Sequence, residues 1–298
     1  MTEKVDTTAP LLSVTDLSIS VPQSRKQSVE VTHGVSFDIE KGGTVGLVGE
    51  SGSGKSLTSL AIMGLLPKGA TTTGSVSFRG GELLGAPNAV MRKIRGAEIA
   101  MIFQDPLSSL NPYYTVGNQI SEAYRAHNKA SRAEAYELTI GAMERVGIPR
   151  VKETINQYPH QFSGGMRQRI MIAMALVCRP SLVIADEPTT ALDVTVQARV
   201  LDLIRELQDE TGAGLLFITH DLAVVSTMAR DVVVLQNGKI QEQGPTRDVF
   251  TRPQSDYTRM LLKATPRLAD SRLSPTTTTS IPVPGSQSKD PWEGAKFS

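Results

Sequence analysis

The amino-acid sequence predicts an α/β fold with a largely parallel sheet at its core. From residue 44 onward, short apolar runs typical of buried strands alternate with stretches of helical apolar spacing. A glycine-rich turn joins the first of these strands, Thr44–Gly49, to a predicted helix at Lys55–Leu66. A long helical stretch between Gln104 and Ser181 interrupts the alternation, so we expect it to form a lobe of its own.

Further strands and helices are predicted before and after this turn. Leu17, Ile19 and Val21 alternate with serines, and apolar residues mark a second extended stretch at Val29–Ile39. The later elements follow in chain order. Helices are predicted at Asn118–Gly147, Met166–Cys178 and Val194–Glu210, strands at Ser181–Ala185, Gly214–Thr219 and Val232–Leu235, and a turn at Asn237–Gly238.

Composition excludes several classes of protein. The 31 basic and 30 acidic side chains leave a net charge of +1, which provides no general attraction to nucleic acid or anionic lipid. The longest uninterrupted apolar run, Ile170–Cys178, has nine residues, whereas a membrane-crossing helix needs about 20. The single cysteine, Cys178, is expected in the core, without a disulfide or a thiolate metal cluster. Because no secretory signal is visible either, we expect a cytoplasmic protein that meets a membrane only through partners.

The glycine-rich turn matches the P-loop pattern GxxxxGK[ST] in full. Its glycines let successive N–H groups point at the β- and γ-phosphates, and the helix N-terminus adds its positive end. Lys55 is expected to contact the β/γ oxygens, and Ser56 to bind Mg²⁺. The alternative is a glycine-rich turn with an incidental lysine, but the strand before it and the helix after it favour nucleoside triphosphate binding. The loop comprises Gly49, Glu50, Ser51, Gly52, Ser53, Gly54, Lys55 and Ser56.

Acidic and imidazole side chains follow two other predicted strands. Asp186 ends a buried strand where a P-loop Mg²⁺ needs a carboxylate, and Glu187 is placed to accept a proton from an attacking water. Two acids at a strand end are usually only solvated, but the preceding P-loop favours the catalytic hypothesis. His220 is expected to orient the water near the γ-phosphate, although a lone histidine is more often structural. The other histidines show no ligand spacing, so no histidine metal site is predicted.

The segment Phe162–Met166, with the sequence Phe-Ser-Gly-Gly-Met, resembles the signature motif of the ATP-binding-cassette (ABC) ATPases. Gln104 resembles the Q-loop glutamine of that family, Thr190–Asp193 its D-loop and His220 its switch histidine. The resemblance covers about residues 12–262. It implies a P-loop NTPase fold of the ABC type, with a mainly parallel sheet core, an antiparallel β subdomain and a helical subdomain.

The same resemblance implies domain boundaries and shared roles. The cassette is expected over residues 10–265, with its helical subdomain at about 106–180, and residues 266–298 form a Ser/Thr/Pro-rich tail that we expect to be disordered. ATP and Mg²⁺ are the implied cofactors. Gln104 is expected to act in catalysis beside Glu187 and His220, to bind Mg²⁺ with Ser56 and Asp186, and to report the nucleotide state to a permease. Ser163, Gly164 and Gly165 would contact nucleotide held by a facing ATPase subunit. Asp193 is also expected to bind nucleotide.

The residues around these motifs resemble the bacterial oligopeptide, dipeptide and nickel importers. The matching segments are Gln104–Pro106, Ser109–Pro112, Tyr158–His160 and Pro188–Thr195. This resemblance implies a peptide importer ATPase on the cytoplasmic face of the inner membrane, held by two membrane permease subunits. A second ATP-binding subunit and an extracytoplasmic solute-binding protein are the other expected partners, and no nucleic acid is expected. A nickel or opine importer remains an alternative, and so, from another class, does a non-transport cassette ATPase acting on DNA or ribosomes.

Two features depart from the family pattern. Val21 occupies the approximate position of an aromatic residue that stacks on adenine in relatives, and no Phe, Tyr or Trp precedes Phe37. Base recognition is therefore expected to be weaker and less selective. The C-terminal tail also lacks the cysteine-bearing extension of many peptide-importer ATPases, so no role of that extension is carried over.

Overall fold

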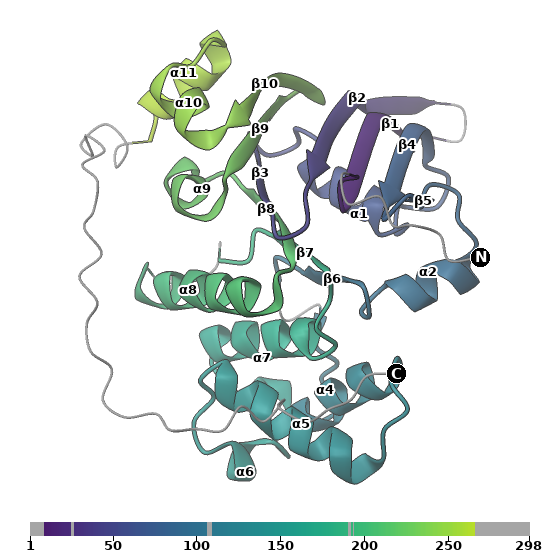
Figure 1. Cartoon of the computed structure of the whole chain (residues 1–298), viewed down its shortest axis with the longest axis vertical. Helices are drawn as coiled ribbons and strands as arrows, with labels where there is room; N and C mark the ends of the chain where they lie inside the picture. Colours follow the sequence, from purple (N-terminus) through teal and green to yellow (C-terminus); the bar gives the residue numbers. More distant parts are fainter. Residues whose placement is uncertain (1–8, 25–26, 106–108, 190–191, 193, 266–298) are drawn as a thin grey trace.

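The computed structural model describes residues 9–24, 27–105, 109–189, 192 and 194–265. Figure 1 shows the two sheets together at one end of the molecule and helices α4–α7 gathered at the other. The predicted tail at 266–298 lies outside the described residues. In the described part of the chain, no helix combines the length and the apolar character that crossing a membrane requires.

A six-stranded sheet forms the centre of the fold, in the order β10–β9–β3–β8–β7–β6. Neighbouring strands are parallel, except that β10 runs antiparallel to β9. Every residue of β7 and β8 is buried, because helices or the second sheet cover both faces, and this explains their uninterrupted apolar sequences. The strands are β3 (Thr44–Val48), β6 (Ile99–Ile102), β7 (Leu182–Asp186), β8 (Gly214–Thr219), β9 (Asp231–Gln236) and β10 (Lys239–Pro245).

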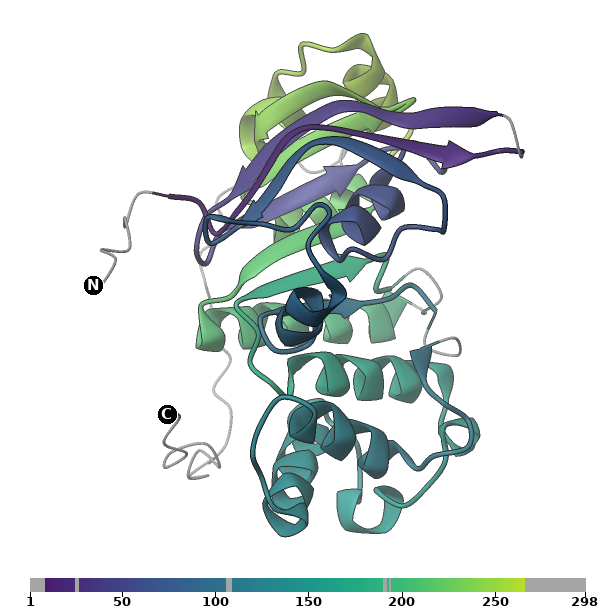
Figure 2. The same ribbon diagram turned by 90° about the vertical axis from the view of Figure 1, so that its right-hand side faces the viewer.

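A second, antiparallel sheet has the order β2–β1–β4–β5 and lies along one side of the first (Figure 2). Its alternating apolar side chains share one core with the larger sheet and with Ala61 and Ile62 of the helix that follows the P-loop. That helix, α1, is therefore packed between the two sheets. The elements are β1 (Leu12–Pro22), β2 (Ser28–Ile39), α1 (Lys55–Ile62), β4 (Thr71–Phe78) and β5 (Gly81–Glu82), followed by α2 (Asn88–Ile94).

A helical lobe is inserted between β6 and β7. Its helices begin at recognisable caps: Thr115, Ser131 and Ser163 each accept a backbone N–H with the side-chain oxygen, and Ser131 forms a capping box with Glu134. Its apolar core continues under β7 and α8. The elements are α4 (Val116–Arg125), α5 (Arg132–Arg145), α6 (Val151–Thr154), the 3₁₀ helix η1 (Pro159–Gln161), α7 (Gly164–Leu176) and, after β7, α8 (Val194–Thr211).

Three C-terminal helices complete the fold beside β3, β9 and β10 (Figure 1). Their apolar side chains form a separate small core with Val48 at the end of β3 and Val234 of β9. This core fixes the chain's last described helix next to the P-loop. The helices are α9 (Leu222–Met228), α10 (Thr246–Thr251) and α11 (Asp256–Lys263).

The predicted fold class is confirmed, and the differences concern element boundaries. The helix predicted to continue to Leu66 ends at Ile62, because Gly64 adopts φ +60° and its N–H caps the helix before the proline is reached. The single helix predicted at 118–147 is two helices, because the Asn128 side chain donates to the Tyr124 carbonyl and Ser131 caps a new helix. The turn at 237–238 is present, with positive φ at both residues.

Candidate functional site

The phosphate-binding loop, residues 49–56, connects β3 to α1 and depends on its glycines. Gly52 and Gly54 have φ values of +81° and +101°, which other residues adopt only with strain. A Cβ atom on Gly54 would lie 2.6 Å from Cγ2 of Thr32, whereas a Cβ atom on Gly52 would meet nothing within 4 Å. Glycine at position 54 is therefore required both by the backbone conformation and by the close approach of β2.

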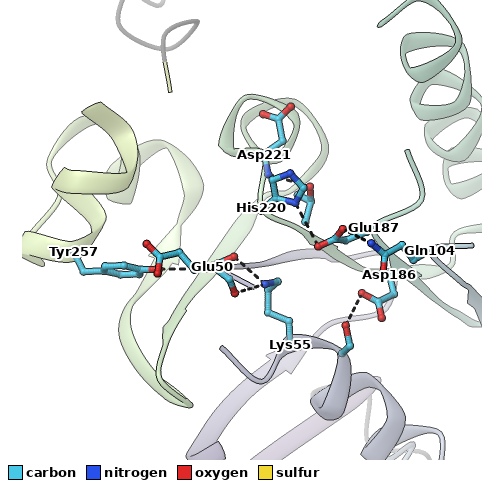
Figure 3. A network of polar contacts seen from close by, with 11 residues as sticks. Glu50, Lys55, Gln104, Asp186, Glu187, His220, Asp221 and Tyr257 are labelled. Carbon is cyan, nitrogen blue, oxygen red and sulfur yellow. Dashed lines mark hydrogen bonds and ion pairs between the residues drawn. The ribbon is translucent and has the colours of Figure 1, made fainter. Parts of the chain in front are cut away.

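The Lys55 side chain is buried beneath this loop and donates to the carbonyl oxygens of Gly49 and Glu50, each at 2.8 Å (Figure 3). Burial lowers the pKa of Lys55, and the carboxylates of Glu187 and Asp186 oppose that shift by stabilising the ammonium. The site thus holds a cation within a group of carboxylates and carbonyl oxygens at the end of β3.

A hydroxyl and a carboxylate meet at the start of α1. The Ser56 hydroxyl donates to Oδ1 of Asp186 at 3.2 Å. Burial raises the pKa of Asp186, and the hydrogen bond from Ser56 opposes that shift. These are the oxygen ligands that Mg²⁺ prefers, and Mg²⁺ usually takes only one or two protein ligands besides phosphates and water. The Ser56 and Asp186 oxygens therefore fit a metal ion that is shared with a phosphate. Among the described residues, no group of three or more His, Cys, Asp or Glu side chains is suited to a metal.

Glu187 lies at the centre of a second group of polar side chains. Gln104 Nε2 donates to Glu187 Oε2 at 2.9 Å, and His220 Nδ1 lies 3.4 Å from Glu187 Oε1 (Figure 3). The three residues follow β6, β7 and β8, whose carboxyl ends lie at the same edge of the sheet. Glu187 itself has φ +47°, and its N–H donates to the Ile218 carbonyl, so the chain turns sharply as it leaves β7.

The P-loop and the group of Gln104, Glu187 and His220 border one cavity of about 550 Å³, a size typical of small-molecule sites. The P-loop forms one wall, and the Gln104–Glu187–His220 group forms another. Of the residues predicted to bind nucleotide within this subunit, most therefore lie around a common space. The cavity is lined by Val31, Glu50, Ser51, Gly52, Gly54, Lys55, Ser56, Leu57, Gln104, Glu187 and His220.

The signature residues do not line this cavity. Ser163 caps the thirteen-residue helix α7, and a Cβ atom on Gly164 would meet nothing within 4 Å, whereas one on Gly165 would lie 2.8 Å from Val196. The N–H groups at this helix start suit an anion, and they lie away from the cavity described above. Asp193, also predicted to bind nucleotide, lies outside the described residues.

Two residues that reach the site from β2 and α11 were missed by sequence reasoning. Val31 on β2 lines the cavity, while Val21 packs with the core beneath the antiparallel sheet. The Tyr257 hydroxyl of α11 accepts the Glu50 N–H at 3.2 Å. Neither residue belongs to a recognisable motif, so only the packing of β2 and α11 against the P-loop could reveal them.

Comparisons with known proteins identify the family. The ABC transporter family model matches residues 32–190. The chain is 50% identical to the dipeptide transport ATP-binding protein DppD of Bacillus subtilis and 48% identical to the oligopeptide transport ATP-binding protein OppD of Escherichia coli. Each match covers 87% of this chain, and it covers 77% of DppD and 76% of OppD.

The fold is also that of solved cassettes. The dimeric structure of MJ0796, a bacterial ABC transporter cassette, matches with a TM-score of 0.71 at 25% identity, over 79% of this chain and 99% of that one. A structure of cbiO1 from Clostridium perfringens, part of the transporter complex cbiONQ, has a TM-score of 0.68 at 25% identity over 87% of this chain and 97% of that one. This protein therefore belongs to the ABC transporter family, as one of its ATP-binding and ATP-hydrolysing chains.

Proposed function

We propose that this ABC ATPase hydrolyses ATP in the cavity between the P-loop and Glu187, and that this hydrolysis energises the import of peptides. The observation that supports the site assignment most strongly is the position of the Glu187 carboxylate. It is held by Gln104 and lies beside His220 in the cavity that the P-loop also lines.

In this proposal each side chain has a distinct role. N–H groups of the curled P-loop surround the phosphates, and the Lys55 ammonium neutralises the charge on the β/γ oxygens. Glu187 takes the proton of the water that attacks the γ-phosphorus. Gln104 donates to one carboxylate oxygen of Glu187, and His220 lies beside the other. The His220 ring would there contact the attacking water and the γ-phosphate of bound ATP.

Ser56 and Asp186 are the residues that would hold Mg²⁺, with Gln104 as a further oxygen ligand. The bound ion would neutralise charge that develops on the phosphate oxygens. The hydrogen bond between Ser56 and Asp186 supports this proposal, because it brings their oxygens close together.

A second ATP-binding subunit completes the site. Ser163, Gly164 and Gly165 offer N–H groups at the start of α7 but lie outside this chain's own cavity. We assign them, with Asp193, to the nucleotide of the facing subunit. ATP then bridges the two subunits, and its hydrolysis removes contacts that exist only in the closed pair.

Peptide cargo is supported by the names of the relatives, which include dipeptide and oligopeptide transport ATP-binding proteins that are 50% and 48% identical to this chain. Two permeases and a solute-binding protein then complete the importer, with this chain at the cytoplasmic face of the inner membrane. Affinity purification of the tagged chain from native membranes, followed by mass spectrometry, tests this assembly. Recovery of two permeases and a solute-binding protein is expected, whereas recovery of ribosomal or DNA-repair proteins instead would refute it.

The catalytic assignment is tested by Glu187→Gln. We expect ATP affinity within twofold of wild type and a loss of turnover of about 100-fold or more, because the amide cannot accept the proton. Lys55→Ala should instead lose ATP binding. Glu153→Gln, at an exposed carboxylate paired with Arg150 on α6, is the matched control and should hydrolyse ATP normally. Wild-type turnover by Glu187→Gln would exclude Glu187 as the base.

A further inference from the structure

The C-terminal helix α11 reaches the phosphate-binding loop through a single tyrosine. The hydroxyl of Tyr257 accepts a hydrogen bond from the Glu50 N–H at 3.2 Å, across a separation of 207 residues in the chain (Figure 3). The Tyr257 ring is buried, 7% exposed, in the small core that also contains Val48 and Val234. The hydroxyl is therefore placed by packing at the end of β3, where the loop begins.

This hydrogen bond acts on a peptide group that Lys55 also holds. The N–H of Glu50 belongs to the peptide unit whose carbonyl is that of Gly49, and the Gly49 oxygen accepts from Lys55 Nζ at 2.8 Å. A peptide unit is planar, so fixing its oxygen and its hydrogen fixes the orientation of the whole group. The first bend of the P-loop is thus held from both sides, by Lys55 and by Tyr257.

The helix that carries Tyr257 is anchored independently of the P-loop. Glu242 on β10 accepts the N–H groups of Gln254 and Ser255, at 2.8 and 3.0 Å. Ser255 then caps α11 by accepting the N–H of Tyr257. These contacts connect the tyrosine to the central sheet, so the position of its hydroxyl is set by packing and hydrogen bonds that do not involve the P-loop.

Packing elsewhere between α11 and the loop does not replace the hydrogen bond. A cavity of about 560 Å³ lies between them, and Gly49, Glu50, Leu261 and Ala264 are among its lining residues. In the described part of the chain, the Tyr257 hydroxyl provides a direct hydrogen bond from α11 to the P-loop.

We propose that Tyr257 is a positioning residue for ATP binding: its hydroxyl holds the Gly49–Glu50 peptide in the orientation that the phosphate cradle requires. This inference rests on the proposed role of the P-loop. It also makes α11 part of the nucleotide site, although the helix contributes no residue to the cavity around Lys55.

Tyr257→Phe tests the proposal, because it keeps the ring and removes only the hydroxyl that accepts the Glu50 N–H. In the full-length chain we expect the dissociation constant for ATP to rise about threefold to tenfold. The KM for ATP of the assembled transporter should rise equally, with kcat within twofold of wild type. Amide hydrogen exchange in the peptide containing Glu50 should accelerate, while the melting temperature changes little.

Tyr124→Phe is the matched control. Tyr124 is also a buried tyrosine but lies on α4 in the helical lobe, so its variant should bind ATP like wild type. Glu242→Gln provides a second variant, which weakens the anchor of α11 and should raise the dissociation constant in the same direction.

The outcomes separate this inference from the assignment of the site. If Lys55→Ala loses ATP binding but Tyr257→Phe binds ATP and exchanges its P-loop amides like wild type, the positioning role is wrong. If Tyr257→Phe lowers the melting temperature but leaves the ATP affinity unchanged, the role of Tyr257 is purely structural and the proposal is likewise wrong. If Lys55→Ala binds ATP normally, the P-loop assignment itself fails.

Discussion

Gly54→Ala is expected to destabilise the protein for two separable reasons. The first is the backbone: an alanine at φ +101° has a strained conformation that costs about 1–2 kcal/mol. The second is steric, since the new Cβ would lie 2.6 Å from Cγ2 of Thr32, a buried side chain on β2. Overpacking of this kind costs about 1–3 kcal/mol. We therefore expect the free energy of unfolding to fall by about 2–5 kcal/mol.

Gly52→Ala isolates the backbone contribution. Gly52 also has a positive φ, +81°, but a Cβ atom there meets nothing within 4 Å, so its variant should lose only about 1–2 kcal/mol. Thr32→Ser isolates the steric contribution, because it removes Cγ2 and keeps the hydroxyl that donates to the Leu17 carbonyl. In the double variant with Gly54→Ala, the clash should be relieved while the strain remains.

Urea unfolding followed by circular dichroism measures these differences, provided that the slope with denaturant stays constant across the variants. The double-mutant cycle of Thr32→Ser and Gly54→Ala should show a favourable coupling of about 1–3 kcal/mol. Equal destabilisation by Gly52→Ala and Gly54→Ala, together with a coupling near zero, would refute the argument that β2 limits the space at this glycine.

Three further outcomes are expected. Gln104→Ala should reduce ATP turnover about 10- to 100-fold with little change in ATP affinity, since it removes the 2.9 Å hydrogen bond to Glu187; an unchanged kcat would contradict this role. Burial raises the pKa of the Cys178 thiol to about 11, so iodoacetamide at neutral pH should alkylate it about 100-fold more slowly than glutathione until urea unfolds the chain. Burial also raises the pKa of Glu242, but hydrogen bonds, the strongest from the Gln254 N–H, outweigh this and lower it below its usual value. The ionised Glu242 carboxylate therefore stabilises the protein above its unfolded-state pKa, and this stabilisation is lost as the pH falls through the folded-state pKa. At pH 7, Glu242→Gln should unfold at a lower urea concentration than wild type. This difference should shrink below pH 4.

Much of the site could be predicted because its polar residues follow apolar strands. The end of β3 leads into the P-loop, Asp186 is the last residue of β7, and His220 directly follows β8. Parallel strands present their carboxyl ends at one edge of a sheet, so residues distant in sequence are brought to one place by the fold class alone. The family resemblance added Gln104, which the structure places 2.9 Å from Glu187.

Contacts that depend on side-chain packing could not be predicted in the same way. Tyr257 reaches Glu50 only because α11 packs on β3 and β9, and nothing in the spacing of residues 256–263 indicates this. The same holds for Val31, whose place in the cavity depends on how β2 passes the P-loop. The break at Asn128 within the long helical stretch also depends on a local contact, because the Asn128 side chain donates a hydrogen bond to the Tyr124 carbonyl. Apolar periodicity does not reveal such a hydrogen bond.

The position of the Glu187 carboxylate is set by its backbone as much as by its partners. β7 pairs with β8 as far as Asp186, and the next residue leaves the sheet at φ +47°, with its N–H on the Ile218 carbonyl. A left-handed glutamate costs about 1–2 kcal/mol, and a glycine here would avoid that cost. This turn places the side chain between Gln104 and His220, in the cavity that the P-loop also lines. The placement of this one carboxylate therefore costs some free energy of folding. The same turn separates Asp186, which faces Ser56, from Glu187, which faces the cavity.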